Sequence, residues 1–137
     1  MGIWLLFPLL LLAAGLLLLL RAKSCPPVER GPLAPQEAAD LLRAGRALLI
    51  DLRDAEDFEE LPLPGAVNLP LSRLREEVEG RGLPAGAVIL LCCQTGHRSR
   101  AGALLLRELG FGQVFDLGPV EAVRDLLADS PPPVTPA

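Results

Sequence analysis

The chain has 137 residues, a formal net charge of −4, three cysteines and a single histidine. An acidic chain without a basic run lacks the charge that holds a phosphate backbone, which excludes nucleic-acid binding. The odd number of cysteines, two of them adjacent, excludes a disulfide scaffold, and one histidine without cysteines at zinc-finger spacing gives no zinc site.

An uncharged apolar stretch lies near the start of the chain, at residues 3–20. Its length reaches the lower limit for a helix that crosses the hydrocarbon core of a bilayer, so we predict one transmembrane anchor at residues 1–23. Arg21 and Lys23 follow this stretch, whereas only the terminal amine precedes it. The positive-inside rule then places the rest of the chain in the cytoplasm. The alternative is a cleaved signal peptide, which would leave the domain periplasmic or secreted.

The remainder is predicted to divide into a linker, one domain and a tail. Residues 24–33 contain three prolines and a glycine, which favour an extended linker. The length of the chain after the anchor allows a single domain, which we expect at residues 34–129. Residues 130–137 contain four prolines and are expected to be a disordered tail.

Helical and strand patterns alternate along the domain. Apolar residues at helical spacing indicate helices, and short, almost wholly apolar runs indicate strands that are covered on both faces. The predicted elements are a helix at residues 36–44, a strand at 47–52, a helical turn at 54–60, a strand at 66–69, a helix at 71–78, a strand at 87–92, a helix at 99–109, a strand at 114–117 and a helix at 120–128. This alternation predicts an α/β domain with a mostly parallel central sheet flanked by helices, whose ligand crevice lies at the carboxyl ends of the strands.

A polar loop follows the central apolar run at such a carboxyl end. We take Cys93 as the catalytic candidate, and as substrate-binding candidates the residues that follow it, Gln94, Thr95, Gly96, His97, Arg98 and Ser99. Free amides at the start of a helix favour an anion, so the loop amides and Arg98 are expected to lower the pKa of Cys93 and hold it as a thiolate. Gly96 is expected to supply a positive φ, and Ser99 to cap the helix.

The positions of the neighbouring residues on the predicted strands and helix indicate their roles. Cys92 is expected to point into the core, away from the face of Cys93. An arginine in the first helical turn opposes the helix dipole, so Arg98 needs an anionic partner, for which substrate or thiolate is expected. Asp51 and Arg53, at the end of another predicted strand, are expected to hold a neighbouring loop in place.

The order and spacing of these segments resemble the rhodanese (thiosulfate sulfurtransferase) family over residues 34–123. The segments that carry the resemblance are Cys-x-x-Gly-x-Arg-Ser at residues 93–99, Leu-Ile-Asp-Leu-Arg at 49–53, Glu-Asp-Phe at 56–58, Pro-Gly-Ala-Val-Asn-Leu-Pro at 64–70 and Leu-Gly-Phe at 109–111. The family position of His97 varies widely, which favours an exposed loop residue there. Relatives usually continue with a second glycine and an aromatic residue where this chain has Pro119 and Val120, which affects one wall of the pocket.

The resemblance implies sulfur transfer. Cys93 would take the outer sulfur of thiosulfate or another small anionic persulfide donor, carry it as a persulfide and give it to a thiol or cyanide acceptor, with no cofactor. Two other functions stay open: a cysteine phosphatase or arsenate reductase, and a membrane-tethered binding module without turnover. Four residues separate Cys93 from Arg98, one fewer than in the cysteine phosphatases, which counts against the first. No protein partner is predicted.

Overall fold

A four-stranded sheet organises the part of the chain that the computed structural model describes, residues 33–129. The strands are β1 (Leu48–Asp51), β2 (Ala66–Asn68), β3 (Val88–Cys93) and β4 (Gln113–Pro119), in the order β2-β1-β3-β4. Every neighbouring pair is parallel, so all the carboxyl ends lie at one edge of the sheet. The predicted α/β fold with a parallel sheet is confirmed.

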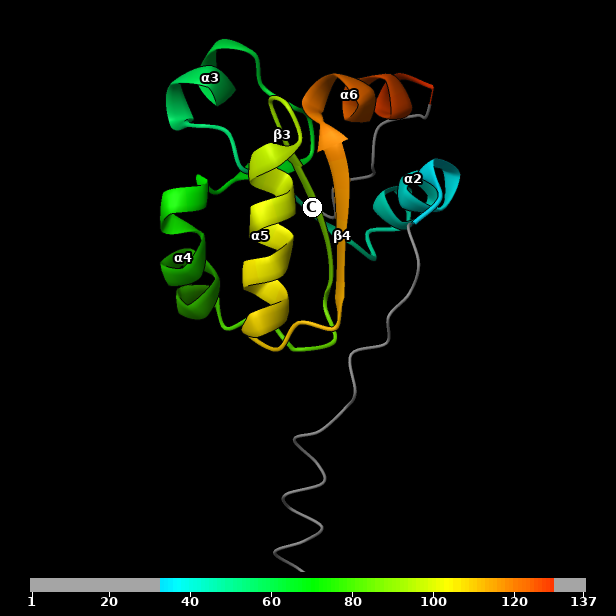
Figure 1. Cartoon of the computed structure of the whole chain (residues 1–137). Coiled ribbons are helices and arrows are strands. Elements are labelled where there is room, and N and C mark those ends of the chain that lie inside the picture. Colours follow the sequence, from blue (N-terminus) through cyan, green and yellow to red (C-terminus); the bar gives the residue numbers. More distant parts are fainter. Residues whose placement is uncertain (1–32, 130–137) are drawn as a thin grey trace, which may run out of the picture.

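Helices cover both faces of this sheet (Figure 1). One face carries α2 (Pro35–Arg43) and α6 (Val120–Ala128). The other carries α4 (Leu74–Arg81) and α5 (His97–Glu108), and the short α3 (Ala55–Glu60) lies beyond the carboxyl end of the sheet. Two neighbouring parallel strands need a crossover connection that packs back on the sheet. The helical periodicity between the apolar runs predicts these crossover helices, so the sequence predicts the order of elements correctly.

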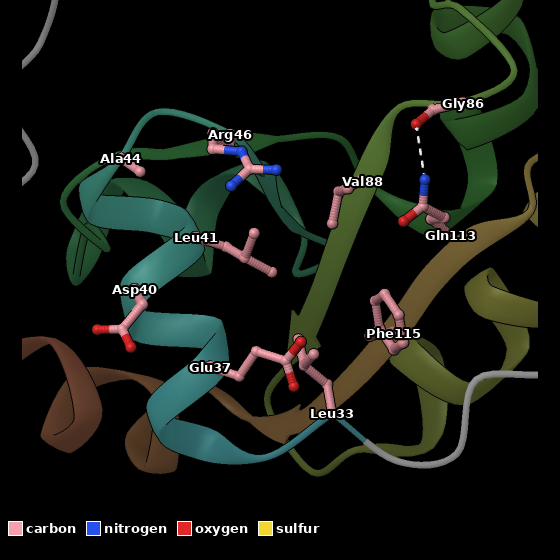
Figure 2. A pocket seen from close by; sticks show the side chains of 10 residues that line it. All are labelled: Leu33, Glu37, Asp40, Leu41, Ala44, Arg46, Gly86, Val88, Gln113 and Phe115. Atoms are coloured by element: carbon pink, nitrogen blue, oxygen red, sulfur yellow. Dashed lines mark hydrogen bonds between the residues drawn. The ribbon is translucent and has the colours of Figure 1, made fainter.

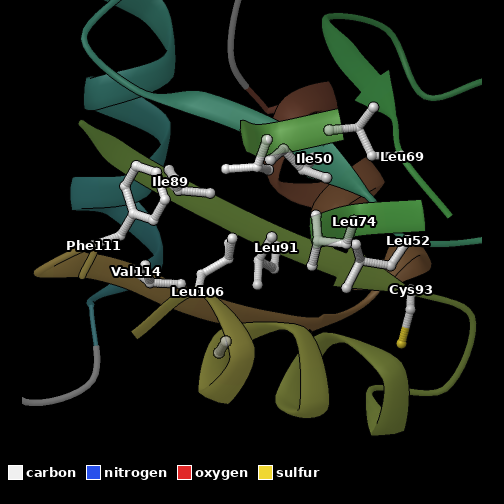
Figure 3. Close-up of a cluster of buried hydrophobic side chains, with 12 residues drawn as sticks. Ile50, Leu52, Leu69, Leu74, Ile89, Leu91, Cys93, Leu106, Phe111 and Val114 are labelled. Carbon is white, nitrogen blue, oxygen red and sulfur yellow. The ribbon is translucent and has the colours of Figure 1, made fainter. Parts of the chain in front are cut away.

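The sheet separates two cores. Figure 3 shows the core on the side of α4 and α5, in which buried side chains from β1, β3 and β4 meet the helices. The second core lies between the sheet and the helices α2 and α6. Alternation along β3 divides its residues between them: Leu91 and Cys93 belong to the first core, Leu90 and Cys92 to the second. The predicted opposite orientation of the two cysteines is confirmed.

Several boundaries differ from the sequence prediction. The segment predicted as one helix at residues 71–78 begins with a 3-10 turn, η2 (Leu71–Arg73), and continues as α4 through Gly80 to Arg81. Gly82, at a φ of 61°, ends it, because only glycine adopts that left-handed conformation at little cost. The last strand is longer than predicted and extends to Pro119, because it pairs with β3 as far as Cys93.

The anchor at 1–23, most of the linker and the tail at 130–137 lie outside the residues that the structure describes. Between residues 33 and 129, no helix combines the length and the apolar character needed to span a membrane. The transmembrane anchor therefore stays a prediction from sequence.

Candidate active site

Cys93 is the last residue of β3, at the carboxyl edge of the sheet. It lies opposite Pro119 of β4, just after an irregularity in the pairing of the two strands. The helix α5 begins only four positions later, at His97, two residues earlier than predicted, because Gly96 in a left-handed conformation ends the loop. The sulfur points toward the start of α5 (Figure 3). Its side chain is fully buried, so the nucleophile is screened from bulk water.

Backbone amides surround the Cys93 sulfur. The Gly96 N–H donates to Sγ at 3.0 Å, and the Ser99 N–H donates to it at 3.3 Å. Gly96 has a φ of 91°, which confirms the predicted positive φ, and this conformation turns its amide toward the sulfur. A Cβ added at Gly96 would lie 3.6 Å from Gly118 Cα. The cradle is therefore built from the loop of α5 packed against the end of β4.

Two opposing effects set the pKa of Cys93. Burial raises it, because desolvation disfavours the thiolate. The Ser99 hydroxyl, followed by the amides of Ser99, Gly96 and Thr95, lowers it, and the net result is a pKa below that of an ordinary thiol. The sequence predicted this direction and the role of the amides, whereas Arg98 is not among the principal causes.

The Ser99 hydroxyl has a suitable position for both protonation states of Cys93. Its Oγ lies 3.6 Å from Sγ and donates to the Gly96 carbonyl at 3.0 Å. When the sulfur is a thiol, it donates to Ser99 Oγ. When it is a thiolate, the hydroxyl proton turns to the sulfur, and the Gly96 carbonyl keeps the N–H of Arg100 at 3.3 Å. The predicted capping role of Ser99 is wrong, because α5 begins at His97, its N-cap position is Gly96 and no side chain caps it. Ser99 lies within the first turn of α5, where its hydroxyl stabilises the anion.

Cys92 is unsuited to nucleophilic chemistry. It is fully buried in the core beside α2 and α6, and its thiol lies 3.7 Å from the carbonyl oxygen of Ile50. Burial, followed by the nearby carboxylate of Asp51, raises its pKa to about 12. The adjacent cysteines therefore differ in chemistry because they lie on opposite faces of one strand.

Arg98 has a partner other than the one predicted. Its Nη1 lies 3.4 Å from Oδ2 of Asp54, just after β1, and the two side chains are 42% and 65% exposed. In the structure, the anion beside Arg98 is thus a carboxylate of the chain. Nothing in the local sequence singles out Asp54. The signal was available, because Asp51 pairs with Cys92 in neighbouring parallel strands, and so the residues just after each strand lie close together.

The remaining substrate-binding candidates lie at the outer side of the cradle. Gln94, Thr95 and His97 are exposed. The Thr95 hydroxyl lies 2.9 Å from Nδ1 of His97, so these two side chains are linked to each other. His97 is the first residue of α5, and the expectation that it is exposed is confirmed. The structure brings these residues to the site, and substrate contact stays a prediction for each of them.

The Asp51–Arg53 pair has the predicted structural role. Arg53 is 2% exposed, and its Nη2 donates to Asp51 Oδ2 at 2.7 Å. The same nitrogen donates to the carbonyl of Leu61 at 2.9 Å, and the guanidinium lies 5.7 Å from the ring centroid of Phe58. Arg53 therefore joins the end of β1 to the carboxyl end of α3, which holds Asp54, between them in the chain, beside the cradle.

A separate pocket of about 710 Å³ lies between α2 and the amino ends of β3 and β4 (Figure 2). Its lining includes Glu37, Arg46, Val88 and Gln113, and contains no cysteine, serine, threonine or lysine. Ligand sites of parallel sheets lie at the carboxyl ends, which is where Cys93 is found. We therefore place the active site at Cys93. Within residues 33–129, no three His, Cys, Asp or Glu side chains are grouped closely enough to hold a metal.

Together, the parallel sheet and the cysteine in an amide cradle at its carboxyl edge define a class: α/β domains with a cysteine-centred anion site. The particular family is recognised over residues 34–118, which match the Rhodanese-like domain. The chain belongs to this family. The resemblance inferred from the sequence is confirmed, and at the family level it points to sulfur transfer.

Two curated relatives illustrate the similarity. The thiosulfate sulfurtransferase GlpE of Pseudomonas fluorescens is 31% identical over 83 residues, which cover 61% of this chain and 74% of the relative. The putative sulfur carrier protein YrkF of Bacillus subtilis is 33% identical over 73 residues, 52% of this chain, and here the chain spans only 37% of the relative. Among solved structures, the human single domain sulfurtransferase TSTD1 has 25% identity and a TM-score of 0.58, covering 69% of this chain and 96% of that one.

Proposed function

We propose that this chain is a sulfurtransferase that carries sulfane sulfur on Cys93. The observation that supports this most directly is the position of the Cys93 sulfur, which accepts N–H groups from Gly96 at 3.0 Å and Ser99 at 3.3 Å. Such a cradle stabilises a thiolate before transfer and the terminal sulfur of a persulfide after it. Membership of the family and a relative named as a thiosulfate sulfurtransferase support the same reaction.

In the first step, the Cys93 thiolate attacks the outer sulfur of thiosulfate or of another persulfide donor. A new S–S bond to Cys93 forms, the S–S bond of thiosulfate breaks, and sulfite leaves with the bonding electron pair. No proton moves in this step if the cysteine is already ionised, which is the form favoured by its lowered pKa. The buried position of the sulfur keeps the bound persulfide away from water.

In the second step, cyanide or a thiolate attacks the outer sulfur of the Cys93 persulfide. The S–S bond breaks, its electron pair returns to Cys93 as a thiolate, and the product is thiocyanate or a new persulfide. Each step leaves the cradle with one negative charge on sulfur, so the same amides act throughout. Two half-reactions through a covalent intermediate predict ping-pong kinetics.

The test compares sulfur transfer with phosphate ester hydrolysis on the purified full-length chain. Thiosulfate with cyanide should yield thiocyanate, an aryl phosphate should yield no phenol, and Cys93→Ser should abolish the first activity. Four residues separate Cys93 from Arg98, and this short loop closes around one sulfur atom more readily than around three phosphoryl oxygens. Phosphatase activity that depends on Cys93, without thiocyanate formation, would instead identify a phosphatase, and neither activity would identify a binding module.

We also propose that residues 1–23 anchor the domain to a membrane, with the catalytic part in the cytoplasm. The uncharged stretch at residues 3–20 and the basic residues after it support this proposal. A tethered sulfurtransferase would act on donors and acceptors close to the membrane surface.

A further inference from the structure

The contact between Arg98 and Asp54 is incomplete as an ion pair. Nη1 of Arg98 lies 3.4 Å from Oδ2 of Asp54, yet this nitrogen makes no hydrogen bond and is itself shielded from solvent. A shielded donor without a hydrogen bond is unfavourable, because it loses its water and gains no replacement. Arg98 is therefore in a position to donate a hydrogen bond to an incoming anion.

Asp54 is held at this place by the fold. It directly follows Arg53, whose guanidinium is bound to the buried carboxylate of Asp51 and to the carbonyl of Leu61. The Asp54 carbonyl accepts the Phe58 N–H at 3.1 Å, whereas its carboxylate makes no cap to α3. The backbone of Asp54 is thus fixed, and its exposed carboxylate is available to interact with Arg98.

We propose that Asp54 determines anion selectivity at the active site, because its carboxylate competes with the anionic group of the sulfur donor for Arg98. The identity of the ligand as a sulfur anion rests on the proposed function, while the competition itself requires only an anion that approaches Cys93. The Cys93 side chain has no exposed surface in this state, so an anion must enter the cradle region before it can react.

The competition has a defined electrostatic consequence. The Asp54 carboxylate neutralises part of the Arg98 charge and itself repels anions. Removing its charge should raise the local concentration of anions at the cradle, and most of the effect should require Arg98, because only the direct repulsion is relieved without it. A partly exposed pair of this kind is expected to change an anion's rate or affinity by about two- to fivefold. Glu56, an exposed carboxylate of α3, makes no ion pair with Arg98 in the described structure and provides a matched control.

The experiment measures alkylation of Cys93 in the full-length chain by two reagents of similar size, the anionic iodoacetate and the neutral iodoacetamide. In both reactions the thiolate displaces iodide and forms a C–S bond, so the ratio of the two rates cancels the intrinsic reactivity of the sulfur. Modification is assigned to Cys93 by peptide mass spectrometry. The variants are Asp54→Asn, Glu56→Gln, Arg98→Gln and the double variant of Asp54→Asn with Arg98→Gln.

The iodoacetate to iodoacetamide ratio should rise about two- to fivefold in Asp54→Asn and stay unchanged in Glu56→Gln. It should fall in Arg98→Gln, and adding Asp54→Asn to that variant should raise it by less than the same substitution does in the wild type. In the sulfur transfer assay, Asp54→Asn should lower KM for thiosulfate and leave kcat unchanged.

Equal ratios in Asp54→Asn and Glu56→Gln, or a lower ratio in Asp54→Asn, would overturn the proposal. Alkylation does not depend on sulfur transfer, so an absence of thiocyanate together with a raised ratio would contradict the proposed function and leave the role of Asp54 supported.

Discussion

Replacing Ser99 with alanine isolates the contribution of one hydroxyl to the thiolate. The Ser99 hydroxyl lowers the pKa of Cys93 more than any of the backbone amides does, and the backbone N–H of Ser99 stays in place in the variant. We therefore expect Ser99→Ala to raise the pKa of Cys93 without removing the amide cradle.

The size of the shift follows from the geometry. A hydrogen bond to a charged group contributes about 1.5–3 kcal/mol, and about 1.4 kcal/mol corresponds to one pKa unit. Oγ lies 3.6 Å from Sγ, which is long for such a bond and favours the lower end of the range. We expect an upward shift of about one unit. The fold should change little, because the Gly96 carbonyl that loses the hydroxyl keeps the Arg100 N–H.

The assay is the pH dependence of iodoacetamide alkylation at Cys93, whose midpoint reports the thiol pKa. Thr95→Val is the matched control, since it also removes a hydroxyl but one that contacts His97 rather than the sulfur. The midpoint should move upward in Ser99→Ala and stay in place in Thr95→Val. Coinciding midpoints for wild type and Ser99→Ala would refute the assignment of Ser99 as a thiolate donor.

Three further predictions concern stability and topology. Cys92 has a folded pKa of about 12 against an ordinary value of 9.0, so its buried thiol stabilises the fold below about pH 9 and this contribution is lost as pH rises toward 12. Denaturant unfolding should show the wild type losing about 1.4 kcal/mol between pH 7 and pH 10 in excess of any loss in Cys92→Ala, and parallel losses would contradict the assignment. A Cβ at Gly102 would lie 2.6 Å from Leu52 Cδ1, so Gly102→Ala should destabilise the fold by about 1–3 kcal/mol, whereas Gly80→Ala, with nothing within 4 Å, should stabilise α4 by up to about 1 kcal/mol. A reporter fused after Ala137 should be active only as a cytoplasmic enzyme, and activity only as a periplasmic or lumenal enzyme would reverse the predicted topology.

The order of elements and the place of the nucleophile were predictable from the sequence. Apolar runs and helical spacing identify the strands and helices, and the carboxyl end of a parallel strand is where such folds place their ligands. The polar loop after the central strand therefore predicts Cys93 as the nucleophile. Alternation of side chains along that strand predicts that Cys92 points into the core. These features depend on local patterns that the sequence records directly.

Features that depend on contacts between distant segments were not predictable to the same degree. The partner of Arg98 is Asp54, 44 positions earlier in the chain, and only the strand order brings the two together. The start of α5 at His97 depends on the left-handed Gly96, which packs against Gly118 near the end of β4. The tight approach of Gly102 to Leu52 likewise has no local signal, because glycine within a helix has many causes.

The central claim is that Cys93 carries sulfur as a persulfide, and mass spectrometry of the full-length chain tests it most directly. The purified protein is treated with thiosulfate, freed of excess reagent and analysed without reducing agent. We predict an added mass of one sulfur atom on the peptide that contains Cys93, its loss after addition of cyanide, and no adduct in Cys93→Ser. An unmodified Cys93 peptide after treatment, or an adduct that persists in Cys93→Ser, would contradict the account.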